Sequence, residues 1–155
     1  MSKRENCTFF GHRDFGKIEY KDYIEEIFEY LILNENVCVF LSGGMGNFDR
    51  ICEGVIRKLK RKYYHICLKL ILSYTDDLNF KIAKRDINLY DEIVFPNLKA
   101  KSSKDAIPKR NIFMVNNCGF VISGVYKNEG GAAAAVKYAQ SQIDVRIVDI
   151  FKRKL

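Results

Sequence analysis

VCVFLSGGMGNFD, residues 37–49, combines a strand, a glycine turn and the start of a helix. Its first five residues are all apolar, which is typical of a strand covered on both faces. Gly43, Gly44 and Gly46 allow turns that a Cβ would forbid, and a helical pattern begins at Phe48. This combination favours an anion site, because unpaired N–H groups and the helix dipole point at the turn.

The rest of the chain alternates strand-like and helix-like segments. Short apolar runs predict strands, and apolar residues spaced three and four apart predict helices. The predicted strands are 7–10, 37–41, 66–72, 92–95, 120–124 and 145–150. The predicted helices are 21–33, 48–62, 109–117 (after Pro108) and 132–142, and a short helix around 80–87 is one interpretation of 76–90. This alternation predicts an α/β protein, a three-layer sandwich with a mainly parallel central sheet.

Length and composition indicate a single domain over residues 1–155, with a mobile loop at about 97–107 and a frayed basic tail at 152–155. No apolar run approaches the roughly 20 residues of a membrane span, and no apolar stretch follows the charged N-terminus as in a signal peptide. The five cysteines form no CxxC pair, so we expect free thiols in a reducing cytosol. These features predict a cytoplasmic protein with no metal and no cofactor.

The net charge of +7 favours an anionic partner. Much of the excess lies in 57–62 (RKLKRK) and in the tail. The first segment alternates with Leu59, which is typical of a solvated helix face, and neither segment has aromatic residues spaced for base stacking. Single-stranded nucleic-acid binding through the basic helix is therefore kept as a second alternative, with Lys58, Lys60, Arg61 and Lys62 as its residues.

In a parallel sheet, ligands bind beyond the carboxyl ends of the strands, and three predicted loops meet at that edge: 11–14, 42–49 and 126–131. In the first loop, Arg13 could bind a phosphate with its planar guanidinium. His12 could transfer a proton or, alternatively, cap a backbone group.

The second loop lacks the GK[ST] of a Walker loop, and a tight connection between strand and helix is the alternative interpretation of its glycines. Asp49 could cap the helix, bind a ribose hydroxyl, or act as an acid or base. Glu53 lies one turn further along the same helical face, as a second carboxylate of the site or as a solvated one.

The third and fourth segments of interest also precede predicted helices. Lys109 and Arg110 would place cations at a helix N-terminus, which the helix dipole disfavours unless an anionic ligand or an acidic neighbour compensates. Gly130 and Gly131 repeat the strand–turn–helix pattern, either for an anion or for close helix packing, and Glu129 adds a carboxylate.

Four segments, CTFFGHRD, SGGMGNFDR, PKRNIFMV and GGAAAAVKYA, resemble one small branch of the SLOG superfamily. This Rossmann-like superfamily joins the DNA-processing protein A fold and the cytokinin-activating LOG proteins, and the order and spacing of the segments agree over residues 7–150. The resemblance implies a nucleotide-type ligand and a homo-oligomer. The matching positions are Gly11, His12, Arg13, Gly43, Gly44, Gly46, Asp49, Arg110, Asn111, Gly130, Gly131 and Ala132.

The chain departs from the PGGxGTxxE signature of the phosphoribohydrolases, because Ser42, Asn47 and Arg50 replace its proline, threonine and glutamate. We therefore expect binding of a phosphate-bearing nucleotide or an ADP-ribose-like molecule, with Ser42 and Glu129 added to the matching positions as ligand contacts. The first alternative is N-glycosidic hydrolysis of a nucleotide, with Asp49 and Glu53 as the catalytic candidates.

Overall fold

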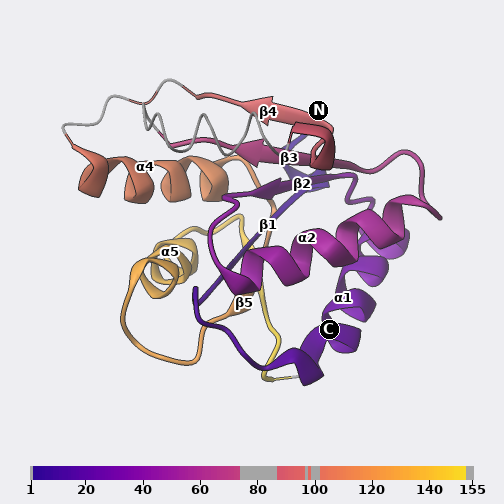
Figure 1. Ribbon diagram of the computed structural model, residues 1–155, viewed down its shortest axis with the longest axis horizontal. Helices are drawn as coiled ribbons and strands as arrows, with labels where there is room; N and C mark the ends of the chain where they lie inside the picture. Colours follow the sequence, from indigo (N-terminus) through magenta and orange to yellow (C-terminus); the bar gives the residue numbers. More distant parts are fainter. Residues whose placement is uncertain (1, 74–86, 97, 99–101, 153–155) are drawn as a thin grey trace.

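Six parallel strands, in the order β4-β3-β2-β1-β5-β6, form the central sheet of the computed structural model, which describes residues 2–73, 87–96, 98 and 102–152 (Figure 1). The predicted α/β class with a parallel sheet is confirmed. The strands are β1 (Asn6–Gly11), β2 (Val39–Ser42), β3 (Cys67–Ile71), β4 (Glu92–Val94), β5 (Phe120–Gly124) and β6 (Arg146–Asp149). The helices are α1 (Lys21–Asn34), α2 (Asn47–Lys60), α4 (Ser103–Asn116) and α5 (Gly131–Gln140), with short 3-10 helices η1 (Lys3–Glu5), η2 (Ile18–Tyr20) and η3 (Ile87–Leu89).

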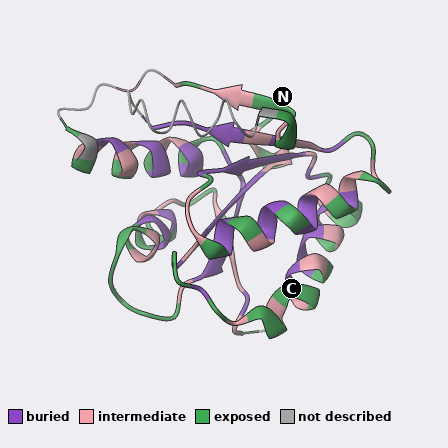
Figure 2. Cartoon of the chain, in the orientation of Figure 1, coloured by how far each residue is buried: buried purple, intermediate pink, exposed green. Residues whose placement is uncertain are grey.

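The sheet separates two apolar cores, so its central strands are buried on both faces (Figure 2). On one face, α1 and α2 pack side chains such as Phe28 and Ile56 against the sheet. On the other face, α4 and α5 contribute Met114 and Val136. Each large apolar side chain buried in this way stabilises the fold by about 1.5–3 kcal/mol. Among the described residues, none of the helices has the length and apolar character needed to cross a bilayer.

The start of α4 differs most from the sequence-based prediction. The helix begins at Ser103, where Asp105 and Ala106 donate backbone hydrogen bonds to the Ser102 carbonyl at 3.1 and 3.0 Å. The predicted start at Pro108 is wrong, because proline inside a helix removes only one backbone donor and the turns around it still form. The predicted loop is therefore helical over 103–107.

The other predicted boundaries agree within about two residues. Part of the predicted loop (97 and 99–101), the predicted helix at 80–86 and the tail at 153–155 lie outside the described residues. All five cysteines are free thiols, and Cys7, Cys52 and Cys118 are buried.

Phe48 joins α2 to the carboxyl ends of the two central strands. Gly11 of β1 and Gly124 of β5 are register partners, and the Phe48 ring lies against both, so that a methyl group at either glycine would overlap the ring. Phe15 packs edge-on against the same ring, with centroids 5.0 Å apart. The two glycines therefore provide the space that lets the first turn of α2 approach the sheet.

Substitution of Gly124 by alanine should lower the free energy of unfolding by about 3 kcal/mol, because the added methyl group overpacks Phe48. The matched control is Gly54→Ala on α2, where an added Cβ meets no atom within 4 Å. That change should raise stability by up to about 1 kcal/mol through helix propensity. Urea unfolding of both variants measures the difference, and equal stability of the two would contradict the packing role of Phe48.

Candidate functional site

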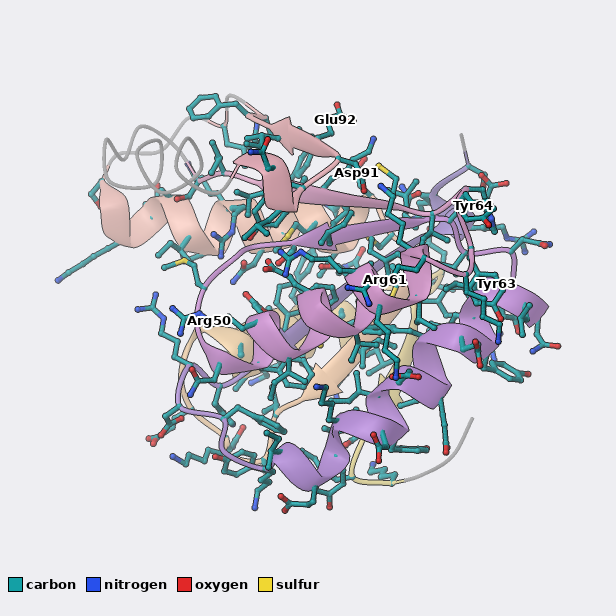
Figure 3. The ribbon with its side chains drawn as sticks, turned by 45° about the vertical axis from the view of Figure 1, so that its right-hand side comes forward. Arg50, Arg61, Tyr63, Tyr64, Asp91 and Glu92 are labelled. Carbon is teal, nitrogen blue, oxygen red and sulfur yellow. The ribbon has the colours of Figure 1, made fainter. Side chains whose placement is uncertain are left out.

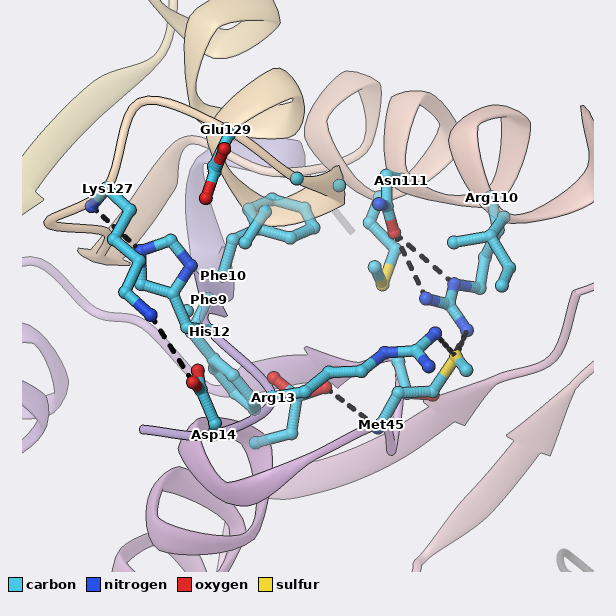
Figure 4. A pocket seen from close by; sticks show the side chains of 18 residues that line it. Phe9, Phe10, His12, Arg13, Asp14, Met45, Arg110, Asn111, Lys127 and Glu129 are labelled. Carbon is cyan, nitrogen blue, oxygen red and sulfur yellow. Dashed lines mark hydrogen bonds and ion pairs between the residues drawn. The ribbon is translucent and has the colours of Figure 1, made fainter. Parts of the chain in front are cut away.

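A cavity of about 520 Å³ lies at the carboxyl edge of the sheet, between the loops that follow β1, β2 and β5 and one face of α4 (Figure 4). The topology brings these segments together because all strands are parallel and their carboxyl ends share an edge. Most of the residues predicted as ligand contacts line this cavity, namely Gly11, His12, Arg13, Gly43, Asp49, Arg110, Asn111, Glu129, Gly130, Gly131 and Ala132. Their roles as ligand contacts stay predictions.

Arg110 is a buried guanidinium at this cavity, with only 4% of its surface exposed. It donates to the Gly43 carbonyl at 3.1 Å and to the Asn111 side-chain oxygen at 3.2 and 3.4 Å. Gly43 is required for this contact, because a Cβ there would lie 2.8 Å from the guanidinium. Within the described chain, the acceptors of Arg110 are uncharged, and it forms no ion pair with a carboxylate.

Arg13 approaches the same place from the loop after β1. Its guanidinium and that of Arg110 both donate to the sulfur of Met45, at 3.9 and 3.4 Å (Figure 4). A thioether is a weak acceptor, so it does little to offset two neighbouring positive charges. Two guanidinium groups that converge without a carboxylate between them favour binding of an anion.

Asp49 occupies the first turn of α2 and is 8% exposed. Its Oδ2 atom accepts the Met45 backbone N–H at 2.9 Å, which holds the glycine turn onto the helix. Burial raises the pKa of Asp49 to about 7, although this hydrogen bond and the charge of Arg110 lower it. Asp49 therefore ties the glycine turn to the first turn of α2 and is also a buried carboxyl group whose pKa lies near neutral pH.

The two helix N-termini at this edge differ in the state of their N–H groups. In the turn before α2, the N–H of Gly44 is bonded to Ser42 Oγ at 3.0 Å, and that of Asn47 to the Arg13 carbonyl at 2.9 Å. At α5, Gly130 is the N-cap, no side chain caps the helix and its first turn has no acidic residue. The N-terminus of α5 is thus the end that retains its anion-binding groups.

Glu53 and Ser42 belong to a separate network and do not line the cavity. Ser42 Oγ donates to Glu53 at 2.5 Å, and Tyr90 and Arg57 also donate to this carboxylate, at 2.9 and 3.1 Å. These bonds satisfy Glu53 at 4% exposure and orient the strand end that precedes the glycine turn. The alternative of a solvated Glu53 is therefore wrong, because Glu53 is buried in this network; its catalytic role beside Asp49 stays a prediction.

Gly44 and Gly46 also serve the turn rather than the cavity wall, with φ values of 66° and 92° that favour glycine. A Cβ at Gly46 would lie 2.5 Å from the Arg13 backbone, so this glycine lets Arg13 pack against the turn.

His12 holds the loop after β5 in place. Its Nε2 atom accepts the backbone N–H groups of Tyr126 and Lys127 at 3.1 and 3.0 Å, which requires a neutral ring with its proton on Nδ1. Burial lowers the pKa of His12, and the charge of Lys127 lowers it further. Of the two roles considered for His12, this geometry corresponds to the backbone cap.

Sequence reasoning did not select several cavity residues. Met45, Asp14 and Lys127 lie within the three predicted loops but were not singled out. On α4, Ile107 and Met114 share one helical face with Arg110, at the spacing of three and four residues that marks such a face. The predicted start at Pro108 left Ile107 outside the helix and hid this pattern. Phe9 and Phe10 complete the wall from β1.

The basic segment at the end of α2 is largely paired with acidic residues. Lys58 pairs with Glu25 at 2.9 Å, Lys62 with Glu29 at 3.3 Å, and Lys60 with Asp91. Arg61 is the C-cap residue of α2, and Figure 3 shows it beside that helix. The fixed acidic partners reduce the positive field that a nucleic-acid backbone would meet here.

Arg110 was predicted at the N-terminus of a helix, and the structure has it in the middle of α4. Because α4 begins at Ser103, Lys109, Arg110 and Asn111 lie in its middle, and Lys109 pairs with Asp105 at 3.2 Å. The argument from the helix dipole is therefore wrong for these residues, and the burial of Arg110 without an ion-paired carboxylate takes its place.

The geometry defines a Rossmann-like α/β protein with a cavity at the carboxyl edge of its sheet. No protein-family model matches the chain, and no curated protein matches it. Among solved structures, it is similar to DNA processing protein A (DprA) from Streptococcus pneumoniae, with a TM-score of 0.64 and 15% sequence identity. The similarity covers 93% of this chain and 49% of DprA, so the chain spans about half the length of that protein. This likeness shows a shared fold.

Asp49 should make the stability of the protein depend on pH. The folded state binds its proton more tightly than the unfolded state, so the free energy of unfolding should fall as pH rises from about 4 to about 7. At 1.4 kcal/mol per pKa unit, the fall is about 4 kcal/mol at most. Asp49→Asn should remove it while still accepting the Met45 N–H.

Urea unfolding at several pH values, compared between wild type and variant, measures this difference. The control is Asp14→Asn, an exposed carboxylate at the same cavity whose pKa is lowered by its hydrogen bond to Lys127. Its contribution is lost only as pH falls below about 4, so the slope between pH 5 and 7 should be unchanged. An identical slope in wild type and Asp49→Asn would contradict the shifted titration.

Proposed function

We propose that this protein binds a phosphate-bearing nucleotide or an ADP-ribose-like molecule in the cavity at the carboxyl edge of the sheet. The observation that carries the proposal is the buried Arg110, which shares the Met45 sulfur with Arg13 and has only uncharged acceptors in the described chain. A buried cation without a hydrogen-bonded counter-charge is costly, and Asp49 acts on Arg110 only through its charge, without an ion pair. A bound phosphate would supply the missing charge.

The N-terminus of α5 supports the same ligand. Gly130, Gly131 and Ala132 line the cavity, and a Cβ at either glycine would meet no atom within 4 Å, so the space before these N–H groups is open. The helix dipole and the free N–H groups favour a phosphate there. The turn before α2 is less suited to a phosphate than the sequence indicates, because the N–H groups of Gly44, Met45 and Asn47 already have acceptors within the protein.

The size and walls of the cavity support a ligand larger than phosphate. Its volume of about 520 Å³ is within the range of small-molecule sites, roughly 300–1,000 Å³. Phe10, Ile107 and Met114 give it apolar walls beside the charged groups. A nucleotide combines an apolar base with an anionic phosphate and so matches both kinds of wall. The resemblance of four sequence segments to the SLOG superfamily supports the same class of ligand.

The matched pair Arg110→Gln and Arg50→Gln tests the anion site, since Arg50 is exposed and does not line the cavity. Calorimetric titration with AMP, NAD and ADP-ribose should show binding of at least one of them to the wild-type protein. Loss of a charge-assisted hydrogen bond costs about 1.5–3 kcal/mol, so Arg110→Gln should weaken binding by about 10- to 100-fold. Arg50→Gln should bind like wild type.

Absence of binding by all three compounds to folded wild-type protein would contradict the proposal. Equal affinity in Arg110→Gln and wild type would place the ligand away from this guanidinium.

The hydrolase alternative loses one of its two carboxylates, since Glu53 is held by Ser42, Tyr90 and Arg57. Asp49 has the pKa of an acid–base group, and it is the observation that favours catalysis. We propose binding without turnover, because a hydrolase requires groups for both the attacking water and the leaving base.

Incubation of AMP and CMP with a high concentration of protein should therefore release no free base on chromatography. Release of base by the wild type that is absent in Asp49→Asn would overturn binding without turnover and support the hydrolase.

A further inference from the structure

Asp49 is the one buried carboxyl group that lines the cavity within the described part of the chain, since Asp14 and Glu129 are exposed. Its Oδ2 atom accepts the Met45 N–H, while no described residue donates a hydrogen bond to Oδ1. Arg110 and Arg13 both act on its charge, yet neither forms an ion pair with it. Asp49 therefore has one oxygen committed to the fold and one available at the cavity.

Burial is the strongest influence on Asp49 and favours its protonated form, and the charges around it add to or oppose that effect. Arg110 from α4 and Arg13 from the loop after β1 favour the carboxylate, whereas Glu53 on α2 favours the protonated form. Cys52 lies on the same helix turn as a buried thiol whose pKa is raised well above its usual value, so it stays uncharged.

The opposite rim of the cavity carries a further set of charged groups. Lys127 and Glu129 lie in the loop after β5, and Asp14, which pairs with Lys127 at 3.3 Å, lies in the loop after β1. His12 is neutral. Burial and the Met45 hydrogen bond act on Asp49 with or without a ligand, so the two guanidinium groups are the influence on its charge that a bound anion can change.

A phosphate at these guanidinium groups changes that balance. It takes over their positive charge, which had stabilised the Asp49 carboxylate, and it adds negative charge at the same cavity. Both effects favour a protonated Asp49. A protonated carboxyl group is a hydrogen-bond donor, and the Oδ1 atom is the oxygen that is available to donate.

We propose that Asp49 is a specificity-determining group of the site, which takes up a proton when the nucleotide binds and donates it in a hydrogen bond to the phosphate. This inference rests on the proposed function of the cavity. No bond is made or broken except the O–H bond formed on Asp49 with a proton from solvent. Because binding and proton uptake are linked, affinity falls as pH rises from 7 to 8, by up to about tenfold.

Calorimetry in buffers of different ionisation enthalpy measures the proton uptake. The probes are AMP and ADP-ribose at pH 7.5, where a phosphomonoester, with a second pKa of about 6, is already almost fully ionised. Asp49 is then mostly ionised in the free protein, so wild type should take up about half a proton or more per ligand bound. Asp49→Asn should bind with no uptake and with an affinity that does not change between pH 7 and 8.

The control is Asp144→Asn, which removes an exposed carboxylate that does not line the cavity and should retain the proton uptake of wild type. Binding of either probe without proton uptake, or equal uptake by wild type and Asp49→Asn, would overturn this inference and leave the proposed function intact. Failure of both probes to bind folded wild-type protein would overturn the proposed function, and this inference with it.

Discussion

The packing of the Phe48 ring against Gly11 and Gly124 is the contact on which the position of the cavity residues depends. Gly11 and Gly124 lie side by side at the ends of β1 and β5, and only their missing side chains let the ring come this close. The ring sets where α2 begins, and the next residue of the helix is Asp49, which is thereby placed at the cavity. Gly11, which the sequence analysis predicts as a ligand contact, therefore also provides the space for the Phe48 ring. This explains why one local clash would disturb the core and the site together.

The basic residues at the cavity differ from those on the outer face of α2 in whether they pair with a carboxylate. On the outer face of α2, lysines meet acidic partners on α1 and before β4. At the cavity, Arg110 is more deeply buried than any of these lysines, and its acceptors are a carbonyl, an amide and a thioether. Folding gains little from such an arrangement, since a buried ion is stabilised mainly by its counter-charge. In the proposed function, a bound anion would supply that counter-charge.

The alternation of apolar strands and amphipathic helices was enough to predict the sheet, the layers and the edge at which the loops meet, because each signal is local in the chain. The start of α4 was missed where two local signals compete: Pro108 suits a first helical turn, but the turn at Ser102 begins the helix earlier. The different surroundings of Asp49 and Glu53 could not be predicted from their spacing in the sequence. It depends on Tyr90, which lies far along the chain and donates to Glu53 through the fold. The role of Met45 between two arginines likewise exists only in three dimensions.

The position of β1 has a consequence for synthesis. The first strand of the chain lies between β2 and β5, so its hydrogen bonds on one side wait for residues 120–124. Until that segment has left the ribosome, β1 presents an open edge to its surroundings, and Phe48 has only one of its two glycine neighbours. The cavity also needs Gly130 to Ala132, which are made later still. The cavity therefore cannot form in stages, and its wall is complete only after Ala132 has been made.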